Sequence, residues 1–417
     1  MMKLIKLNLF VAVVVLFGAC NGQKDKNEAQ VEMNYAEKAD SLAHHLIITD
    51  GHIDLPYALQ HKGFNLSDDH LQKMVISTDS GNFDFERAKQ GGLDAPFMSI
   101  YVAATFQDSG GAKEEADTLI SYIHGIINSL PDKFAPGRSP QEIEENFKKG
   151  LISLPMGLEN GAPIGDDLSN VKYFFDKGIR YITLTHSKDN QICDSSYDTA
   201  RTWNGLSPFG VEVVKEMNRV GIMVDVSHLS DSTFYDIMKI TQVPVIASHS
   251  SCRHFTPGWE RNMSDDMIKV LGERGGVLQI NLGTSFLDGD IGKINKDNEV
   301  KMEALLTEKG LEATSIEGKK LIADFKKENP ELFSTLQRVA DHIDNVVEIA
   351  GIDHVGIGTD FDGVDNALPE GLKDVSQYPN LIEELLKRGY SEGDIEKICY
   401  KNVWRVWNEV QKVAGLL

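Results

Sequence analysis

The chain has 417 residues, of which 41% are hydrophobic and 25% are charged, and its formal net charge at pH 7 is −21. This length and composition are typical of a soluble globular protein with a substantial core, folded as one large α/β barrel or as two or three average domains. The negative charge argues against nucleic acid or an anionic membrane surface as a partner, because both would repel an acidic face.

The first twenty residues are expected to be an export signal. Two lysines precede an apolar segment at 9–17, which is too short for a comfortable membrane span, and small residues then lead to Cys20. This arrangement resembles the lipobox of bacterial lipoproteins, which implies a signal peptide at 1–19 and a lipidated Cys20. Residues 20–34 would then be a flexible tether. The expected location is the cell envelope, with the lipid on Cys20 as the only membrane anchor, and a plain cleaved signal is the alternative.

From residue 46 onward, short apolar segments alternate with amphipathic segments of helical length. The pattern predicts eight β-strands, at 46–54, 95–103, 151–158, 181–186, 222–228, 243–249, 276–282 and 355–360. It predicts helices between them at 117–128, 140–149, 208–219, 230–240, 265–273 and 336–350. Eight β/α units in one chain favour a TIM-like (β/α)8 barrel over an open sheet, in a single domain spanning 35–417.

One stretch interrupts this spacing between the seventh strand and its helix. Residues 287–330 are highly charged and contain two polar helical pieces, at 303–310 and 316–328. A connection of this length with helices of its own is typical of a lid or rim insertion, here on the side where the strands end. Two further helices, at 379–387 and 392–413, are expected to cover the end of the barrel.

Histidines and acidic residues stand at the C-terminal ends of the predicted strands. His52 and Asp54 are two residues apart, so the period of a strand puts both side chains on one face before Pro56 ends the strand. Five other strands end in Glu159, His186, His228, His249 and Asp360. Active sites of parallel β/α barrels form at these ends. Each residue alone is more often a hydrogen-bonded histidine or a helix-capping acid, but seven converging residues indicate a site.

The convergent side chains predict a metal centre. Imidazole and carboxylate ligands suit zinc, and three imidazoles with two carboxylates more naturally hold two ions than one. The first ion is placed on His52, Asp54 and Glu159. The second is placed on Glu159, His228 and His249, so that the two oxygens of Glu159 bridge the two zinc ions.

The remaining residues suggest a hydrolytic mechanism. A water or hydroxide between two such ions is acidic enough to attack near neutral pH. Asp360 can take the proton of that water and pass it to a leaving group, whereas Asp362, just before Gly363, is typical of a turn or helix N-cap. His186 is not needed as a ligand and could donate a hydrogen bond to a developing oxyanion.

Six motifs together resemble the membrane dipeptidase (renal dipeptidase) family of metallopeptidases. They are DGHIDLP at 50–56, YITLTH at 181–186, GLSPFG at 205–210, VDVSH at 224–228, ASHS at 247–250 and GTDFDG at 358–363. The resemblance extends from about residue 46 to the C-terminal helix. It implies a binuclear zinc enzyme with a TIM-like barrel, often a homodimer, that cleaves the single peptide bond of dipeptides.

The resemblance also implies roles for single residues. It supports zinc binding by His52, Asp54, Glu159, His228 and His249, acid/base catalysis by Asp360, and substrate contact by His186. It further implies that Arg261 binds the C-terminal carboxylate of the substrate, which a fork-shaped guanidinium can grip at two points. The chain departs from the family pattern in the length of its 287–330 insertion and in Pro96, where a glutamine is common.

The sequence leaves two alternatives open. Another binuclear-metal amidohydrolase, such as a deacylase, lactonase or phosphoesterase, would share the barrel and the metal centre. A lipid-anchored binding protein without catalysis would be expected to lack a metal ligand or the proton-transfer group, and neither is missing from the sequence.

Overall fold

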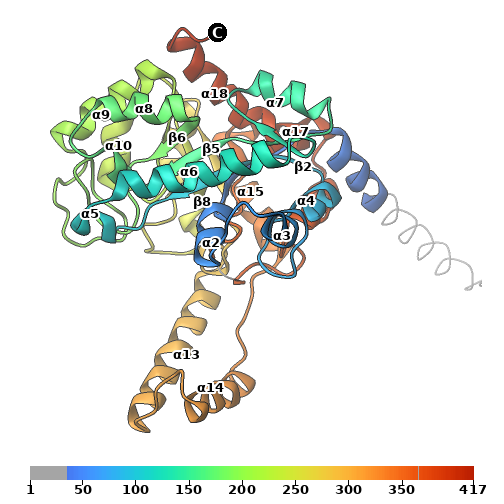
Figure 1. Ribbon diagram of the computed structural model, residues 1–417, viewed down its shortest axis with the longest axis vertical. Helices are drawn as coiled ribbons and strands as arrows, with labels where there is room; N and C mark the ends of the chain where they lie inside the picture. Colours follow the sequence, from blue (N-terminus) through green and yellow to red (C-terminus); the bar gives the residue numbers. More distant parts are fainter. Residues whose placement is uncertain (1–34, 365) are drawn as a thin grey trace, which may run out of the picture.

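The computed structural model describes residues 35–364 and 366–417 (Figure 1). The export signal at 1–19, the tether at 20–34 and the lipidation of Cys20 fall outside the described residues and stay predictions. Among the helices of the described part, none combines the length and the apolar character that a membrane crossing requires.

Eight parallel strands form the centre of the protein, and each overlaps one of the predicted strands. They are β1 (Ile48–Ile53), β2 (Leu93–Tyr101), β5 (Met156–Glu159), β6 (Ile179–Thr183), β7 (Met223–Asp225), β8 (Ile246–Ser250), β9 (Val277–Ile280) and β10 (Val355–Ile357). They pair in this order. The ends of the sheet meet where the Asp54 N–H donates to the Phe361 carbonyl at 2.8 Å and the Asp360 N–H donates to the His52 carbonyl at 3.1 Å. The TIM-like (β/α)8 barrel is therefore confirmed.

The third predicted strand is divided in two. Pro155 separates β4 (Ile152–Leu154) from β5, and β4 pairs with β3 (Phe134–Pro136) in a small sheet of its own. Proline has no N–H to donate to a neighbouring strand, so a continuous central strand through this position is disfavoured. The prediction of one strand over 151–158 was wrong in this respect, and β3 was not predicted.

Six helices on the outside of the barrel lie where they were predicted. These are α6 (Ala112–Ser129), α7 (Pro140–Phe147), α9 (Pro208–Val220), α10 (Asp231–Ile240), α11 (Asp265–Glu273) and α15 (Leu336–Ala350). The side chains of Ser207 and Ser230 accept N–H groups from the first turns of α9 and α10, which satisfies donors that a helix start leaves free. Helices not predicted are α2 (Leu55–His61), α3 (Asp68–Leu71), α4 (Phe85–Gly91), α5 (Thr105–Ser109), α8 (Ser169–Lys177) and α12 (Thr284–Leu287).

Among the C-terminal helices, α18 (Asn402–Val413) packs against the end of the barrel opposite to the strand C-termini, and α16 (Tyr378–Lys387) packs against α15. The segment predicted at 379–387 is α16, and the one at 392–413 comprises α17 (Glu392–Glu396), a π-helical turn and α18. Trp407 of α18 is fully buried, 5.2 Å from the ring of Phe97. Trp404 donates from Nε1 to Thr49 Oγ1 at 3.1 Å, which joins α18 to β1.

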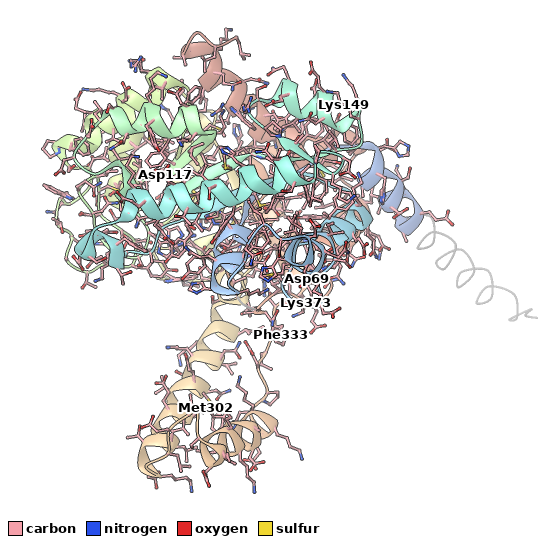
Figure 2. All side chains as sticks on the ribbon, viewed as in Figure 1. Asp69, Asp117, Lys149, Met302, Phe333 and Lys373 are labelled. Atoms are coloured by element: carbon pink, nitrogen blue, oxygen red, sulfur yellow. The ribbon has the colours of Figure 1, made fainter. Side chains whose placement is uncertain are left out.

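The insertion forms a helical arm that extends away from the barrel (Figures 1 and 2). Its helices are α13 (Gly289–Glu308) and α14 (Ile316–Glu328). The first was predicted only from 303. It starts earlier because Asp288 caps it, its side chain accepting the Ile291 N–H. At the base of the arm Lys373 Nζ lies 3.7 Å from the ring centroid of Phe333, a cation–π contact with the body. The arm is therefore attached at the rim and does not cover the barrel.

A buried histidine predicts how the stability of this fold depends on pH. His342 of α15 accepts the Cys252 N–H at Nδ1 and contacts the Leu287 carbonyl from Nε2, both at 3.0 Å, and burial lowers its pKa to about 4. In the unfolded chain the imidazole of His342 binds a proton near pH 6.5, whereas in the folded protein it does so only near pH 4. The neutral, buried His342 therefore contributes fully to the free energy of unfolding above pH 6.5, and this contribution is lost as the pH falls toward 4. The loss is on the order of 3 kcal/mol in the free energy of unfolding. Urea unfolding of His342→Gln at pH 7.5 and 4.5 should show a correspondingly smaller pH effect than wild type, and an equal effect would contradict this role.

Candidate metal centre

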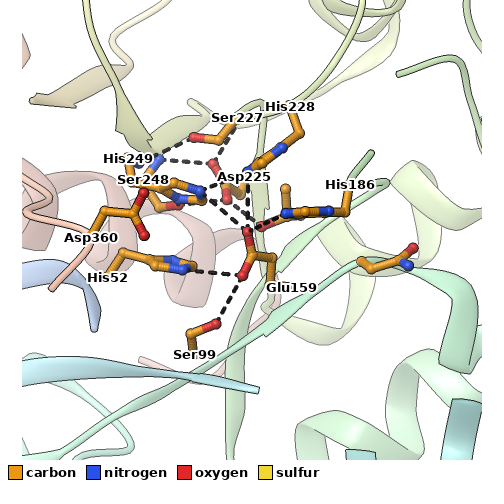
Figure 3. Close-up of polar contacts among 12 residues, drawn as sticks. His52, Ser99, Glu159, His186, Asp225, Ser227, His228, Ser248, His249 and Asp360 are labelled. Carbon is orange, nitrogen blue, oxygen red and sulfur yellow. Dashed lines mark hydrogen bonds and ion pairs between the residues drawn. The ribbon is translucent and has the colours of Figure 1, made fainter. Parts of the chain in front are cut away.

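The structure brings the seven residues predicted at the strand ends together at the strand C-termini, and Figure 3 labels all of them except Asp54. Six of them are at most 8% exposed, and the side chain of His186 is 21% exposed. The residues are His52 in β1, Asp54 just after it, Glu159 in β5, His186 after β6, His228 after β7, His249 in β8 and Asp360 after β10. One buried cluster therefore collects side chains from six strands.

Glu159 lies at the centre of the cluster. Its Oε2 is 3.2 Å from His52 Nε2, and its Oε1 is 3.1 Å from His228 Nε2 and 3.3 Å from His249 Nε2. The Ser99 hydroxyl donates to Oε2 at 3.0 Å and so helps to orient the carboxylate. The pKa of Glu159 is raised by burial, but the neighbouring histidines outweigh this and hold it well below its usual value. The ionised carboxylate thus presents each oxygen to a different side of the cluster, as a bridging ligand must.

The side chains that could share one ion form three overlapping sets. They are His52 with Glu159 and His249, Glu159 with His186 and His228, and His52 with Asp54 and Asp360. The predicted partition uses five of these residues but groups them differently: it puts His249 with His228 and leaves out His186 and Asp360. His186 Nε2 is 3.7 Å from Glu159 Oε1, slightly farther than the other histidines. The division of ligands between two ions remains a prediction.

The hydrogen bonds around His249 and His228 indicate that the Nε2 atom of each imidazole is unprotonated. His249 Nδ1 lies 2.7 Å from the Ser248 hydroxyl, which itself donates to Asp225 Oδ2 at 2.7 Å. The single hydroxyl proton goes to Asp225, so His249 Nδ1 must be the donor and Nε2 is left unprotonated. At His228, Nε2 accepts from Arg261 Nη2 at 3.0 Å, because a guanidinium can only donate.

The short distances among these atoms test whether a metal fits. His228 Nε2 and His249 Nε2 are only 2.8 Å apart, and Glu159 Oε1 faces both. Nearby, His52 Nε2 and Asp54 Oδ1 are buried without a hydrogen-bond partner, which is costly for polar atoms. The acidic groups around His52, together with Tyr181, raise its pKa well above the usual value although burial alone would lower it. Each observation indicates a place where positive charge is stabilising, so the residues fit a cation.

Asp360 lies at the edge of the cluster and is held by an amide. Its Oδ2 accepts from Asn281 Nδ2 at 2.8 Å. Burial and the neighbouring carboxylate of Asp54 raise its pKa to about 7. Asp360 has φ of 62° and His228 has φ of 69°, a region that residues with a Cβ rarely adopt and that often marks functional positions.

Asp362 has a different role from Asp360. Its Oδ1 accepts the Asn82 N–H at 2.8 Å, and its backbone has φ of 64°. It therefore fastens the loop after β10 to the segment before α4 and turns the chain there. The structure supports the expected turn but not an N-cap.

Arg261 reaches the cluster from the loop after β8. It is 2% exposed, and it donates to the Ser250 hydroxyl at 2.6 Å and to the His249 carbonyl at 2.8 Å. Its Nε is buried without a partner. The guanidinium is therefore part of the site, and its Nε lacks a hydrogen-bond partner within the protein.

Several residues that support the cluster were missed at the sequence level. Asp50 accepts the N–H groups of His52 and Thr359, each at 3.0 Å, and the Tyr378 hydroxyl at 2.5 Å, which ties β1 to β10. The Tyr181 hydroxyl lies 2.8 Å from His52 Nδ1 and donates to the Gly51 carbonyl at 3.1 Å. Asp50 and Tyr181, like Ser248 and Asp225, lie inside the motifs already noted, so the motifs were the available signal for them, whereas Tyr378 lies outside every motif.

Comparison with known proteins finds relatives in both sequence and fold. The family model for membrane dipeptidase (peptidase family M19) matches residues 36–417. Dipeptidase aclJ of Aspergillus oryzae is 33% identical over 383 residues, covering 89% of this chain and 79% of that protein. The crystal structure of the probable dipeptidase PvdM of Pseudomonas aeruginosa has a TM-score of 0.77 and 26% identity, covering 92% of this chain and 100% of that one.

A third similar structure contains a ligand. It is a metallo peptidase of Rhodobacter sphaeroides, liganded with a phosphinate mimic of the dipeptide L-Ala-D-Ala. Its TM-score is 0.70 at 24% identity, and the match covers 88% of this chain and 99% of that one. At this level of identity the likeness supports the fold alone.

Proposed function

The chain belongs to the membrane dipeptidase family, and on that premise we propose that it hydrolyses the peptide bond of dipeptides with two zinc ions bridged by Glu159. Metallo-dipeptidase chemistry is common to its relatives. The identity and number of the ions and the roles of single residues are our proposal. The observation that carries it is the position of Glu159, whose two oxygens face different histidines.

The proposed ligands are His52, Asp54, Glu159, His228 and His249. Imidazole and carboxylate groups are the ligands zinc prefers in catalytic sites, and their nitrogen and oxygen atoms lie close enough together here to share a cation. When bound, two zinc ions supply Lewis acidity that makes water more acidic and polarises a carbonyl. The rest of the reaction depends on side chains of this protein.

Asp360 is proposed as the group that moves protons. A carboxyl group with a pKa of about 7 can both accept and release a proton near neutral pH. It would take the proton of the attacking water and deliver it to the nitrogen of the departing amine. Its hydrogen bond from Asn281 holds the carboxyl in place during both steps.

His186 is proposed to stabilise the oxyanion of the tetrahedral intermediate. Burial lowers its pKa, so the imidazole is neutral at neutral pH and can donate one hydrogen bond. It is the most exposed histidine of the cluster, with its side chain 21% exposed, and substrate can therefore reach it. A donor fixed before the reaction stabilises charge that develops in the transition state.

Arg261 explains why the substrate would be short. The guanidinium is proposed to bind the C-terminal carboxylate, and its Nη2 lies only 3.0 Å from His228 Nε2, a proposed ligand atom. A substrate carboxylate bound by a guanidinium this close to the centre would lie near the bond that is cleaved, which favours short substrates. This distinguishes a dipeptidase from a deacylase or lactonase, which needs no such contact.

Arg261→Ala should therefore remove the preference for a free carboxylate. We expect wild type to favour Gly-Phe over Gly-Phe amide by about 100-fold in kcat/KM, the usual cost of losing one charged hydrogen-bonding partner. In the variant the two substrates should differ by less than about 3-fold. Kinetics with both substrates measure this, and Arg274→Ala serves as a control because Arg274 donates to the Thr241 carbonyl elsewhere. A variant that keeps the full preference would favour the deacylase alternative.

We also propose that the protein is an exported lipoprotein anchored through Cys20, and that it acts on dipeptides without a nucleic-acid partner. The support is the sequence of the first twenty residues and the net charge of −21. Cys20→Ser should move the protein from the membrane fraction to the soluble fraction, and an unchanged distribution would refute the anchor.

A homodimer is the proposed oligomeric state, to be measured by light scattering.

A further inference from the structure

Two side chains behind His249 have no assigned role. We propose that Ser248 and Asp225 are positioning residues, which fix the tautomer of His249 and so set the affinity of the centre for the ion that His249 binds. This inference rests on the proposed two-zinc function. It concerns metal affinity, so it can be tested separately from catalysis.

The tautomer of His249 follows from an unbroken series of hydrogen bonds (Figure 3). His249 Nδ1 donates to the Ser248 hydroxyl at 2.7 Å, and that hydroxyl donates to Asp225 Oδ2 at 2.7 Å. A carboxylate can only accept, so the direction of both bonds is determined from its end. A metal-binding histidine is a better ligand when its second nitrogen donates to a fixed acceptor, because the ring is oriented and its free nitrogen becomes more basic.

Asp225 is itself rigidly held. It is fully buried, and besides Ser248 Oγ it accepts the Thr183 hydroxyl at 2.5 Å, the Ser248 N–H at 2.8 Å and the Ser227 N–H at 3.0 Å. All four donors are neutral, so no cationic side chain among these contacts balances its charge. The donors come from β6, β8 and the loop after β7, so the carboxylate joins three neighbouring strands directly behind the site.

His228 provides the contrast within the same centre. Its Nδ1 is buried without a hydrogen-bond partner, and its Nε2 accepts from Arg261. The tautomer of His228 is thus set only by Arg261, at the nitrogen that an ion would use, and no group behind the ring holds it. Of the two histidines assigned to one ion, only His249 is held from behind by its second nitrogen, so the loss of that support should weaken that ion specifically.

The test compares Ser248→Ala with Ser248→Thr, which keeps a hydroxyl. Zinc binding to the metal-free full chain is measured by competition with a chromophoric chelator, and cobalt titrations followed by absorption give a second readout. For Ser248→Ala we expect the dissociation constant of one ion to rise roughly 10- to 100-fold while the other changes less than about 3-fold. Ser248→Thr should restore most of the lost affinity.

Asp225→Asn is the second variant, in case the threonine does not fit the buried site. It should weaken the same ion, and the double variant should be no weaker than Ser248→Ala alone, because both changes interrupt one series of bonds. Ser153→Ala is the matched control. Ser153 is also fully buried and accepts a hydrogen bond, from Asn146 at 3.0 Å, but it lies in β4 away from the centre. Its zinc affinities should equal those of wild type.

Normal binding of both ions by Ser248→Ala, or equal weakening by Ser153→Ala, would overturn the positioning role. Wild type that binds only one ion would instead overturn the two-zinc proposal. In that case the positioning role is still decided by whether Ser248→Ala weakens the single ion and Ser248→Thr restores it.

Discussion

Glu159→Gln is expected to release both ions at once and to lower kcat/KM by at least about 10³-fold, corresponding to roughly 4 kcal/mol of transition-state stabilisation. The reason is geometric. Glu159 Oε2 faces His52, while Oε1 faces His228 and His249, so one carboxylate serves both sides of the cluster. Glutamine keeps the shape but replaces one oxygen with an amide nitrogen that cannot bind a cation. Metal analysis of the purified variant, with dipeptide kinetics, measures the effect.

Asp54→Asn is the matched control for this result. Asp54 contacts only the His52 side, with Oδ2 3.5 Å from His52 Nε2. Its loss should therefore weaken one ion and leave the other bound. Should Glu159→Gln retain one full equivalent of zinc, Glu159 is not a bridge, and the arrangement of the centre proposed above is incorrect.

Asp360→Asn is expected to lower kcat by about 10²- to 10⁴-fold while both ions remain bound. The carboxyl would be lost as a proton acceptor and donor, but asparagine can keep the contact with Asn281, whose amide lies 2.8 Å from Oδ2. Because the change affects proton transfer rather than binding, KM should stay within about 3-fold of wild type. Steady-state kinetics with parallel zinc analysis measure both quantities.

The neighbouring aspartate supplies the control. Asp362 is two residues away but fastens Asn82, and Asp362→Asn should cost stability with less than about a 10-fold change in kcat. If Asp360→Asn instead loses an ion, the residue is a ligand and not the acid/base group. The closeness of Asp360 to His52 and Asp54 makes that outcome a real test.

The barrel was predictable because burial on both faces makes its strands apolar throughout, and each is followed by a polar helical stretch. The errors have local causes. Pro155 divides an apolar segment that otherwise reads as one strand, and α13 begins 14 residues before its predicted start because Asp288 caps a polar sequence. Helix α8, between β5 and β6, was also missed.

The candidate site was predictable where a residue stands at a strand end. His52 and Glu159 follow this rule, and parallel strands bring such positions to one rim. Arg261 does not, because it comes from a loop that turns back over β8, and only the family resemblance indicated it. Ser248 and Asp225 were missed for another reason. Their role depends on the direction of hydrogen bonds between common residue types, which spacing along the chain does not reveal.

Diffraction from crystals of the zinc-loaded protein at the zinc absorption edge tests the central claim most directly. We predict two anomalous peaks, each about 2 Å from a different oxygen of Glu159, one beside His52 and the other beside His249. A single peak, or two peaks with Glu159 outside the coordination distance of either, would contradict the bridged centre on which the proposed reaction depends.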